Sequence, residues 1–151
     1  MRRDLHFEVV YPHAPDRVWR ALTDPRAMAE WLMDNDFAPR IGHRFQFRTA
    51  PAPGFDGIVH CEVLEVDEPR RLSYSWRGGW QRGPTIVTWT LEPVAEGTRV
   101  LLDHSGFEGI GGLALSAMLG RGWRSKILRA LGEVVAQLEE KRHHTERNME
   151  Q

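Results

Sequence analysis

The chain has 151 residues, a length typical of a single domain and sufficient to bury a core without disulfides or metals. Its 20 Lys and Arg residues balance its 21 Asp and Glu residues, so charge gives no reason to expect a nucleic-acid partner, and the single Cys61 excludes an internal disulfide. The N-terminus lacks the apolar run of a signal peptide and no stretch approaches 18 apolar residues, so we expect a cytoplasmic protein without membrane insertion.

The N-terminal part predicts one strand and two helices. Residues 3–11 alternate between apolar and polar side chains, which is the pattern of a strand. Pro15 then stands in the first turn of a helical pattern, and Asp24 with Pro25 divides this pattern into two short helices that end near Trp31. A compact pair of helices should therefore follow the first strand.

The middle of the chain changes to a period of two, with Gly and Pro at the turns. Five strands are predicted there, at residues 43–49, 57–66, 71–77, 85–92 and 98–105. The short connections between most of them favour direct hairpins. We therefore expect an antiparallel meander, which with the first strand makes a sheet of about six strands.

The last third returns to helical spacing. Apolar residues recur every three or four positions over residues 123–138, which predicts one long amphipathic helix. No other element is long and apolar enough to cover the sheet, so the fold class is α+β. We expect the domain to span residues 1–143, with a flexible tail at residues 144–151.

Residues 103–105 read Asp-His-Ser, the residue types of a hydrolase triad. Neighbouring side chains on a strand point to opposite faces, so His104 should point inward with Leu102 while Asp103 and Ser105 point outward. A nucleophile must hydrogen-bond to its base, which excludes a consecutive triad. His104 is then either an acid, base or ligand-bonding group, or a structural histidine bonded to a backbone carbonyl.

Three further signals are weaker. Residues 106–122 are rich in glycine without a phosphate-binding pattern. They predict a mobile flap with Leu113, Leu115, Met118 and Leu119 on its apolar underside, or else a poorly ordered connection or a short packed helix. Trp80, in the connection at residues 77–84, either lines a cavity rim or anchors a partner, or folds back on its own hairpin. The seven histidines show no HxxxH or HExxH spacing, so we expect no metal site.

Several stretches together resemble the START-like (SRPBCC) superfamily, and most of all its branch named after the C-terminal domain of the Hsp90 ATPase activator. They read PDRVWRALTDPRAMAEWL, GHRFQF, VDEPRRLSYSW, TIVTWTLEP, GTRVLLDHSGF and the later GW. Trp31, Asp103, residues 104–107 and Trp123 match family positions, and Asp103 stands where threonine is more usual. The resemblance implies a helix-grip (START/Bet v-like) fold: a strongly curved sheet wrapped around the C-terminal helix, with a deep cavity between them.

The resemblance and the aromatic inward positions together predict binding of a small hydrophobic molecule, aromatic or lipid-like, without a cofactor. The candidate ligand-binding residues are Trp31, Phe47, Cys61, Tyr74, Trp76, Trp89, His104, Phe107, Trp123 and Ile127. His104 and Tyr74 would orient the polar end of the ligand. A filled core, with Trp and Tyr bonded internally, is the alternative interpretation of the same positions.

Two other functions follow from the same resemblance. A cyclase or aromatase would use the same cavity, with His104 moving protons. A stress-chaperone-associated interaction module would bind a protein partner, but the activator proteins carry an additional N-terminal domain for this purpose, whereas this chain begins at its first strand. Either a monomer or a homodimer is compatible with the sequence.

Overall fold

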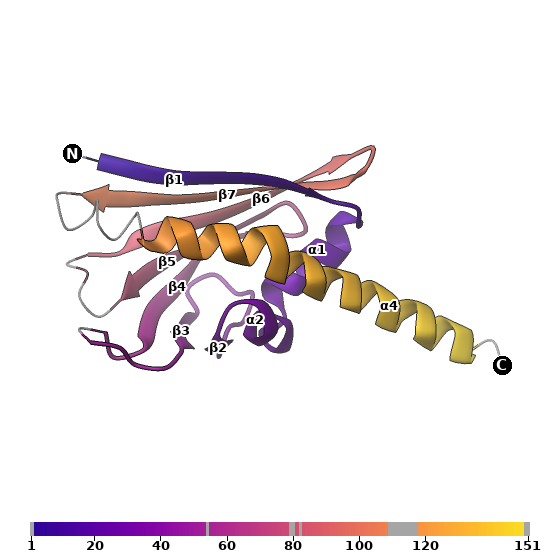
Figure 1. Ribbon diagram of the computed structural model, residues 1–151, viewed down its shortest axis with the longest axis horizontal. Coiled ribbons are helices and arrows are strands. Elements are labelled where there is room, and N and C mark those ends of the chain that lie inside the picture. Colours follow the sequence, from indigo (N-terminus) through magenta and orange to yellow (C-terminus); the bar gives the residue numbers. More distant parts are fainter. Residues whose placement is uncertain (1, 54, 79–80, 82, 109–117, 150–151) are drawn as a thin grey trace.

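The computed structural model describes residues 2–53, 55–78, 81, 83–108 and 118–149, with side chains at all of these except 2, 3, 108, 127, 128 and 141–149. Within these ranges the chain forms one antiparallel sheet in the order β1-β7-β6-β5-β4-β3-β2 (Figure 1). The strands are β1 (Arg2–Tyr11), β2 (Asp34–Asn35), β3 (Arg44–Arg48), β4 (Ile58–Asp67), β5 (Arg71–Gly78), β6 (Thr85–Val94) and β7 (Gly97–Glu108). All six predicted strands are confirmed, and the two-residue β2 is an addition that pairs with β3.

Two short helices follow the first strand, as the sequence predicts. Helix α1 (Pro15–Thr23) begins with a proline in its first turn, where the missing N–H costs nothing. Helix α2 (Pro25–Trp31) is capped by Asp24, whose carboxylate accepts a hydrogen bond from the Arg26 backbone at 3.0 Å. This second proline and its cap separate the two helices.

The C-terminal helix crosses one face of the sheet and continues past α1 (Figure 1). It is α-helical over residues 118–125, π-helical in η1 (Lys126–Ala130) and α-helical again in α4 (Leu131–Met149). Helix α4 also contacts α1 and α2. The backbone stays helical through Met149, so the boundary expected between residues 143 and 144 falls inside a helix.

The two faces of the sheet differ as strand alternation requires. On β7, Val100, Leu102 and His104 are fully buried beneath the C-terminal helix, in line with the inward set predicted from the sequence. On the opposite face, Asp103 bonds to Nδ1 of His6 at 2.7 Å. Asp103 and His104 therefore point to opposite sides of β7, and the consecutive triad is excluded.

The architecture is thus α+β, with the helix-grip arrangement of a curved sheet against a long C-terminal helix. Among the helices of the described ranges, none combines the length and apolarity needed to cross a bilayer.

Candidate functional site

The candidate residues form the centre of the core. Nine of the ten have described side chains, and all nine are buried: Trp31, Phe47, Cys61, Tyr74, Trp76, Trp89, His104, Phe107 and Trp123. The side chain of Ile127 lies outside the described residues. Strand alternation, helical spacing and the family resemblance together identified this buried set, which five strands, helix α2 and the C-terminal helix contribute.

The aromatic rings of this set pack directly on one another. The Trp76 ring centroid lies 5.5 Å from that of Phe47 and 5.3 Å from that of Trp123. Trp89 continues the contact, with centroids 5.7 Å from both Trp31 and Trp123. Such distances are those of aromatic pairs in contact. The rings thus occupy the space between sheet and helix where a deep cavity was expected.

A chain of hydrogen bonds passes through His104. The indole nitrogen of Trp123 donates to His104 Nδ1 at 2.9 Å, and His104 Nε2 lies 2.6 Å from Thr85 Oγ1. The Thr85 hydroxyl in turn donates to the Trp76 carbonyl at 3.0 Å. Because the hydroxyl proton is used on that carbonyl, the Thr85 oxygen accepts from His104 Nε2–H. His104 is therefore the neutral Nε2–H tautomer, bonded on both nitrogens.

Burial lowers the pKa of His104 from its ordinary value of 6.5 to about 3, because the low-dielectric core disfavours the imidazolium. Hydrogen bonding acts in the same direction: a proton on Nδ1 would face the Trp123 indole N–H, leaving two donors opposed. The geometry matches a structural histidine, although its direct partners are two side chains and the backbone carbonyl is reached only through Thr85.

The polar tips of Tyr74 and Cys61 also have partners within the protein. The Tyr74 hydroxyl accepts a hydrogen bond from the Trp89 indole at 3.0 Å, and the Cys61 thiol lies 3.9 Å from the Val59 carbonyl. Burial raises the pKa of both Tyr74 and Cys61, so both are neutral at physiological pH. A ligand bonding to His104 or Tyr74 would have to displace these internal partners.

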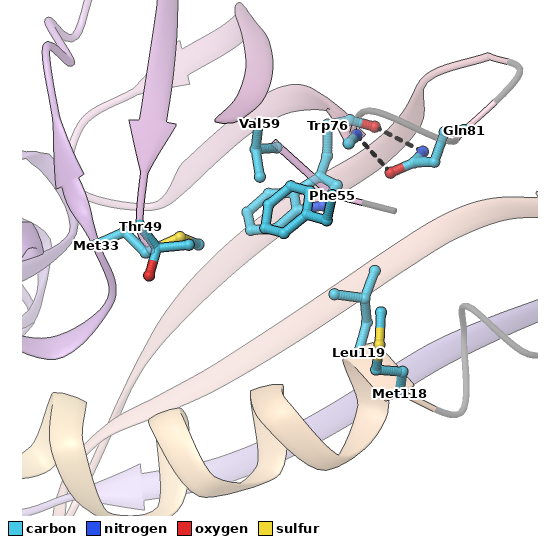
Figure 2. Close-up of a pocket in the computed structure, with 9 residues that line it drawn as sticks. Met33, Thr49, Phe55, Val59, Trp76, Gln81, Met118 and Leu119 are labelled. Carbon is cyan, nitrogen blue, oxygen red and sulfur yellow. Dashed lines mark hydrogen bonds between the residues drawn. The ribbon is translucent and has the colours of Figure 1, made fainter. Parts of the chain in front are cut away.

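Open space lies at one end of this aromatic core, in a pocket of about 170 Å³. Figure 2 shows Phe55 and Trp76 on the side of the sheet, with Met118 and Leu119 across from them at the start of the C-terminal helix. The full lining consists of Met33, Thr49, Phe55, Val59, Trp76, Gly78, Gln81, Met118 and Leu119. Among the candidates whose side chains are described, Trp76 is the one that reaches this lining.

The rim of the pocket is held by Gln81, in the connection after β5. Its side-chain oxygen accepts from the Gly78 backbone at 2.8 Å, and its side-chain nitrogen donates to the Trp76 carbonyl at 3.1 Å (Figure 2). The same nitrogen donates to the Gly83 carbonyl at 3.2 Å. These bonds close the end of β5 and fix the backbone beside the Trp76 ring. Gln81 therefore shapes the pocket while its amide is engaged by the protein.

The family model of the Activator of Hsp90 ATPase homolog 1-like proteins matches residues 12–146. The chain belongs to this family. The predicted resemblance is thereby confirmed over nearly the whole described fold. The comparison with curated proteins finds no match.

Solved structures agree with this assignment. The chain is 33% identical to protein MLL2253 from Mesorhizobium loti, with a TM-score of 0.80 over 89% of this chain and 98% of that one. It is 26% identical to protein BH1534 from Bacillus halodurans, with a TM-score of 0.74 over 89% and 98% of the two chains. DynU16, from the dynemicin biosynthetic locus, is 28% identical with a TM-score of 0.70, over 90% of this chain and 47% of its own.

Strand alternation missed part of the pocket because four of its nine described lining residues come from connections. Met33 follows α2, and Phe55 lies between β3 and β4, where no periodicity marks a direction. Met118 and Leu119, which the sequence predicts on the underside of a flap, line the pocket. The central part of that flap and Trp80 lie outside the described residues. Among the described residues, no cluster of three or more His, Cys, Asp or Glu side chains has metal-binding geometry.

Proposed function

We propose that this protein binds a small hydrophobic molecule in the pocket between the sheet and the start of the C-terminal helix. The observation that carries the proposal is the pocket itself, about 170 Å³ of space lined, among the described residues, by nine side chains or backbone segments of which none is charged. Concave apolar sites with a few polar groups are the usual form of small-molecule sites. The family fold supports a ligand site between sheet and helix in general, and the pocket is the open part of that region.

The volume favours a ligand about the size of one aromatic ring. An apolar cavity of about 150 Å³ in another protein stays dry and binds benzene, so about 170 Å³ suits a substituted ring. A longer, lipid-like molecule would have to extend out of the pocket. Of the two ligand types that the sequence predicts, aromatic and lipid-like, we therefore favour the aromatic one.

In this proposal the candidate residues divide into two roles. Trp76 contacts the ligand, since it lines the pocket. The others belong to the packed core next to it: the rings of Phe47 and Trp123 contact the Trp76 ring, with centroids 5.5 and 5.3 Å away. A close-packed support of this kind keeps the pocket wall in one conformation before the ligand arrives.

The cyclase-type alternative finds no candidate acid or base in this geometry. The described part of the lining contains no Asp, Glu, Lys or His, and His104, which is bonded on both nitrogens, is not one of the lining residues. A chaperone-associated role has one observation in its favour, the description of the family. Its test is whether the purified protein stimulates the ATPase of Hsp90; an unchanged ATPase rate would remove it.

The binding proposal is tested by thermal unfolding with toluene and indole as probes. At ten times its dissociation constant a ligand adds about 1.4 kcal/mol of stability, which for this length raises the melting temperature by about 3 to 6 °C. Leu119→Trp should fill the pocket and remove the shift. Leu64→Trp, on β4 with 41% of its surface exposed, is the matched control and should keep it. No shift in the wild type, or equal shifts in both variants, would overturn the proposal.

A further inference from the structure

Buried tryptophans in this protein mostly have their indole N–H bonded. Trp31 donates to the Ala21 carbonyl at 2.8 Å, Trp89 donates to the Tyr74 hydroxyl at 3.0 Å, and Trp123 donates to His104 at 2.9 Å. This is the usual condition of a buried tryptophan, because an unbonded N–H in a dry environment costs free energy.

Trp19 and Trp76 are also buried and differ from these three, and of the two it is Trp76 that lines the pocket. Only 3% of its surface is exposed, yet its indole nitrogen has no hydrogen-bond partner among the described residues. The nitrogen is not fully enclosed by protein atoms, so it keeps some contact with open space. Trp76 borders the pocket, and the pocket is the open space beside its ring (Figure 2). It therefore supplies an unused hydrogen-bond donor in an apolar wall.

The remaining polar groups of the pocket narrow what such a donor can recognise. The Gln81 amide is already hydrogen-bonded to Gly78, Trp76 and Gly83. The other polar side chain of the described lining is Thr49, whose residue is exposed at the rim. Among the lining residues that the structure describes, none carries a charge. A carboxylate, phosphate or ammonium would lose its hydration here without a countercharge, which is strongly unfavourable.

We infer that the pocket takes a neutral, ring-sized molecule bearing one hydrogen-bond acceptor, and that Trp76 Nε1–H donates to this acceptor. The inference rests on the proposed function and specifies its ligand class, with an aryl ketone, aldehyde or ether as examples. Trp76 is thus the specificity-determining residue of the pocket. A ligand of the same shape without an acceptor would cover the indole N–H and leave it unbonded, which lowers affinity.

The experiment compares three probes of nearly equal size: acetophenone, which carries the acceptor; α-methylstyrene, in which a methylene group replaces the carbonyl oxygen; and benzoate, which is charged. Leaving a buried donor unbonded costs enough to weaken binding by about fivefold or more. We expect acetophenone to bind at least fivefold more tightly than α-methylstyrene, and benzoate not to bind at the same concentrations. Isothermal titration calorimetry gives the three dissociation constants.

Variants locate the preference. Trp76→Phe keeps a ring but removes the N–H, so the two neutral probes should then bind within about twofold of each other. Trp19→Phe is the matched control, because Trp19 is also buried, lies on α1 outside the pocket lining, and should leave the preference unchanged. A second readout needs no variant: in the ¹⁵N-labelled wild type, acetophenone should move one indole N–H resonance downfield and α-methylstyrene should not.

The outcomes separate the inference from the proposal beneath it. If both neutral probes bind with equal affinity, if benzoate binds as well, or if no indole resonance moves downfield with acetophenone, the ligand class is wrong while the hydrophobic pocket stands. If no probe binds the wild type, the proposed function fails and the ligand class fails with it.

Discussion

Lowering the pH from 7.5 to 5.0 should destabilise this protein through His104. In the folded protein burial holds the pKa of His104 at about 3, whereas the unfolded chain has an ordinary histidine with a pKa of about 6.5. Between these values the unfolded state binds a proton that the folded state does not. Stability is therefore unaffected by His104 above pH 6.5 and is lost progressively as the pH falls from 6.5 towards 3.

The magnitude follows from the width of the pH interval. Each unit below pH 6.5 costs about 1.4 kcal/mol for one proton, so the 1.5 units down to pH 5.0 cost about 2 kcal/mol. The environment of the imidazole offers no compensation, because the groups that bond it, Trp123 and Thr85, are neutral. For a chain of this length the loss corresponds to a fall in melting temperature of about 4 to 8 °C.

The assay is urea-induced unfolding at pH 7.5 and pH 5.0, followed by circular dichroism, for the wild type and His104→Gln. Glutamine has both a donor and an acceptor for Thr85 and Trp123 but does not titrate, so the variant isolates the proton from the hydrogen bonds. The variant should start less stable at pH 7.5 and lose about 2 kcal/mol less than the wild type on acidification. Equal losses in the two proteins would refute the assignment of a neutral buried His104.

Two further substitutions test the same core. Thr85→Val leaves His104 Nε2–H without an acceptor and should lower the free energy of unfolding by about 1 to 3 kcal/mol, whereas Thr90→Val, half-buried on the same strand, should change it by less than about 0.5 kcal/mol; similar losses in urea melts would contradict the hydrogen-bond chain. Gly97→Ala should lower the free energy of unfolding by about 2 to 4 kcal/mol, because the φ of Gly97 is 144° and a Cβ there would stand 2.2 Å from the Tyr11 carbonyl oxygen. Gly83→Ala is the control and should be neutral, because nothing lies within 4 Å of its Cβ position. Equal melting temperatures for the two variants would show that the β6–β7 turn tolerates a side chain.

The fold was predictable because its signals are local. Alternation along β7 placed Leu102 and His104 inward and Asp103 outward, and the structure has the same arrangement. Pro15 and Pro25 marked the starts of α1 and α2 for reasons of backbone chemistry alone. The strand period shows which side chains are buried, and proline shows where a helix begins. Both inferences use the local sequence alone.

The hydrogen-bond partners of His104 were not predictable from the sequence. Thr85 reaches Nε2 from β6, and Trp123 reaches Nδ1 from the C-terminal helix. These contacts depend on strand register and on how the helix lies across the sheet. Periodicity fixes the face on which a side chain lies but carries no information on either quantity.

The position of the pocket could not be predicted from the apolar periodicity of the sequence either. Whether inward aromatic rings meet or leave a cavity depends on the curvature of the sheet and the distance of the helix, and here the rings meet. The pocket instead forms at their edge, where Met33 and Phe55 come from connections without regular periodicity. The π-helical turn η1, just after Trp123, likewise had no signal in the spacing of apolar residues.

The most direct test of the ligand pocket uses the methionines as reporters. The chain has five, of which Met33 and Met118 line the pocket, whereas Met28 is fully buried in the core and is not one of the described lining residues. With ¹³C-labelled methionine methyl groups, titration with toluene should shift the Met33 and Met118 signals along one common binding curve and leave Met28 in place. Unchanged signals for Met33 and Met118 at saturating toluene would contradict the pocket as the binding site, and so would a Met28 shift as large as theirs.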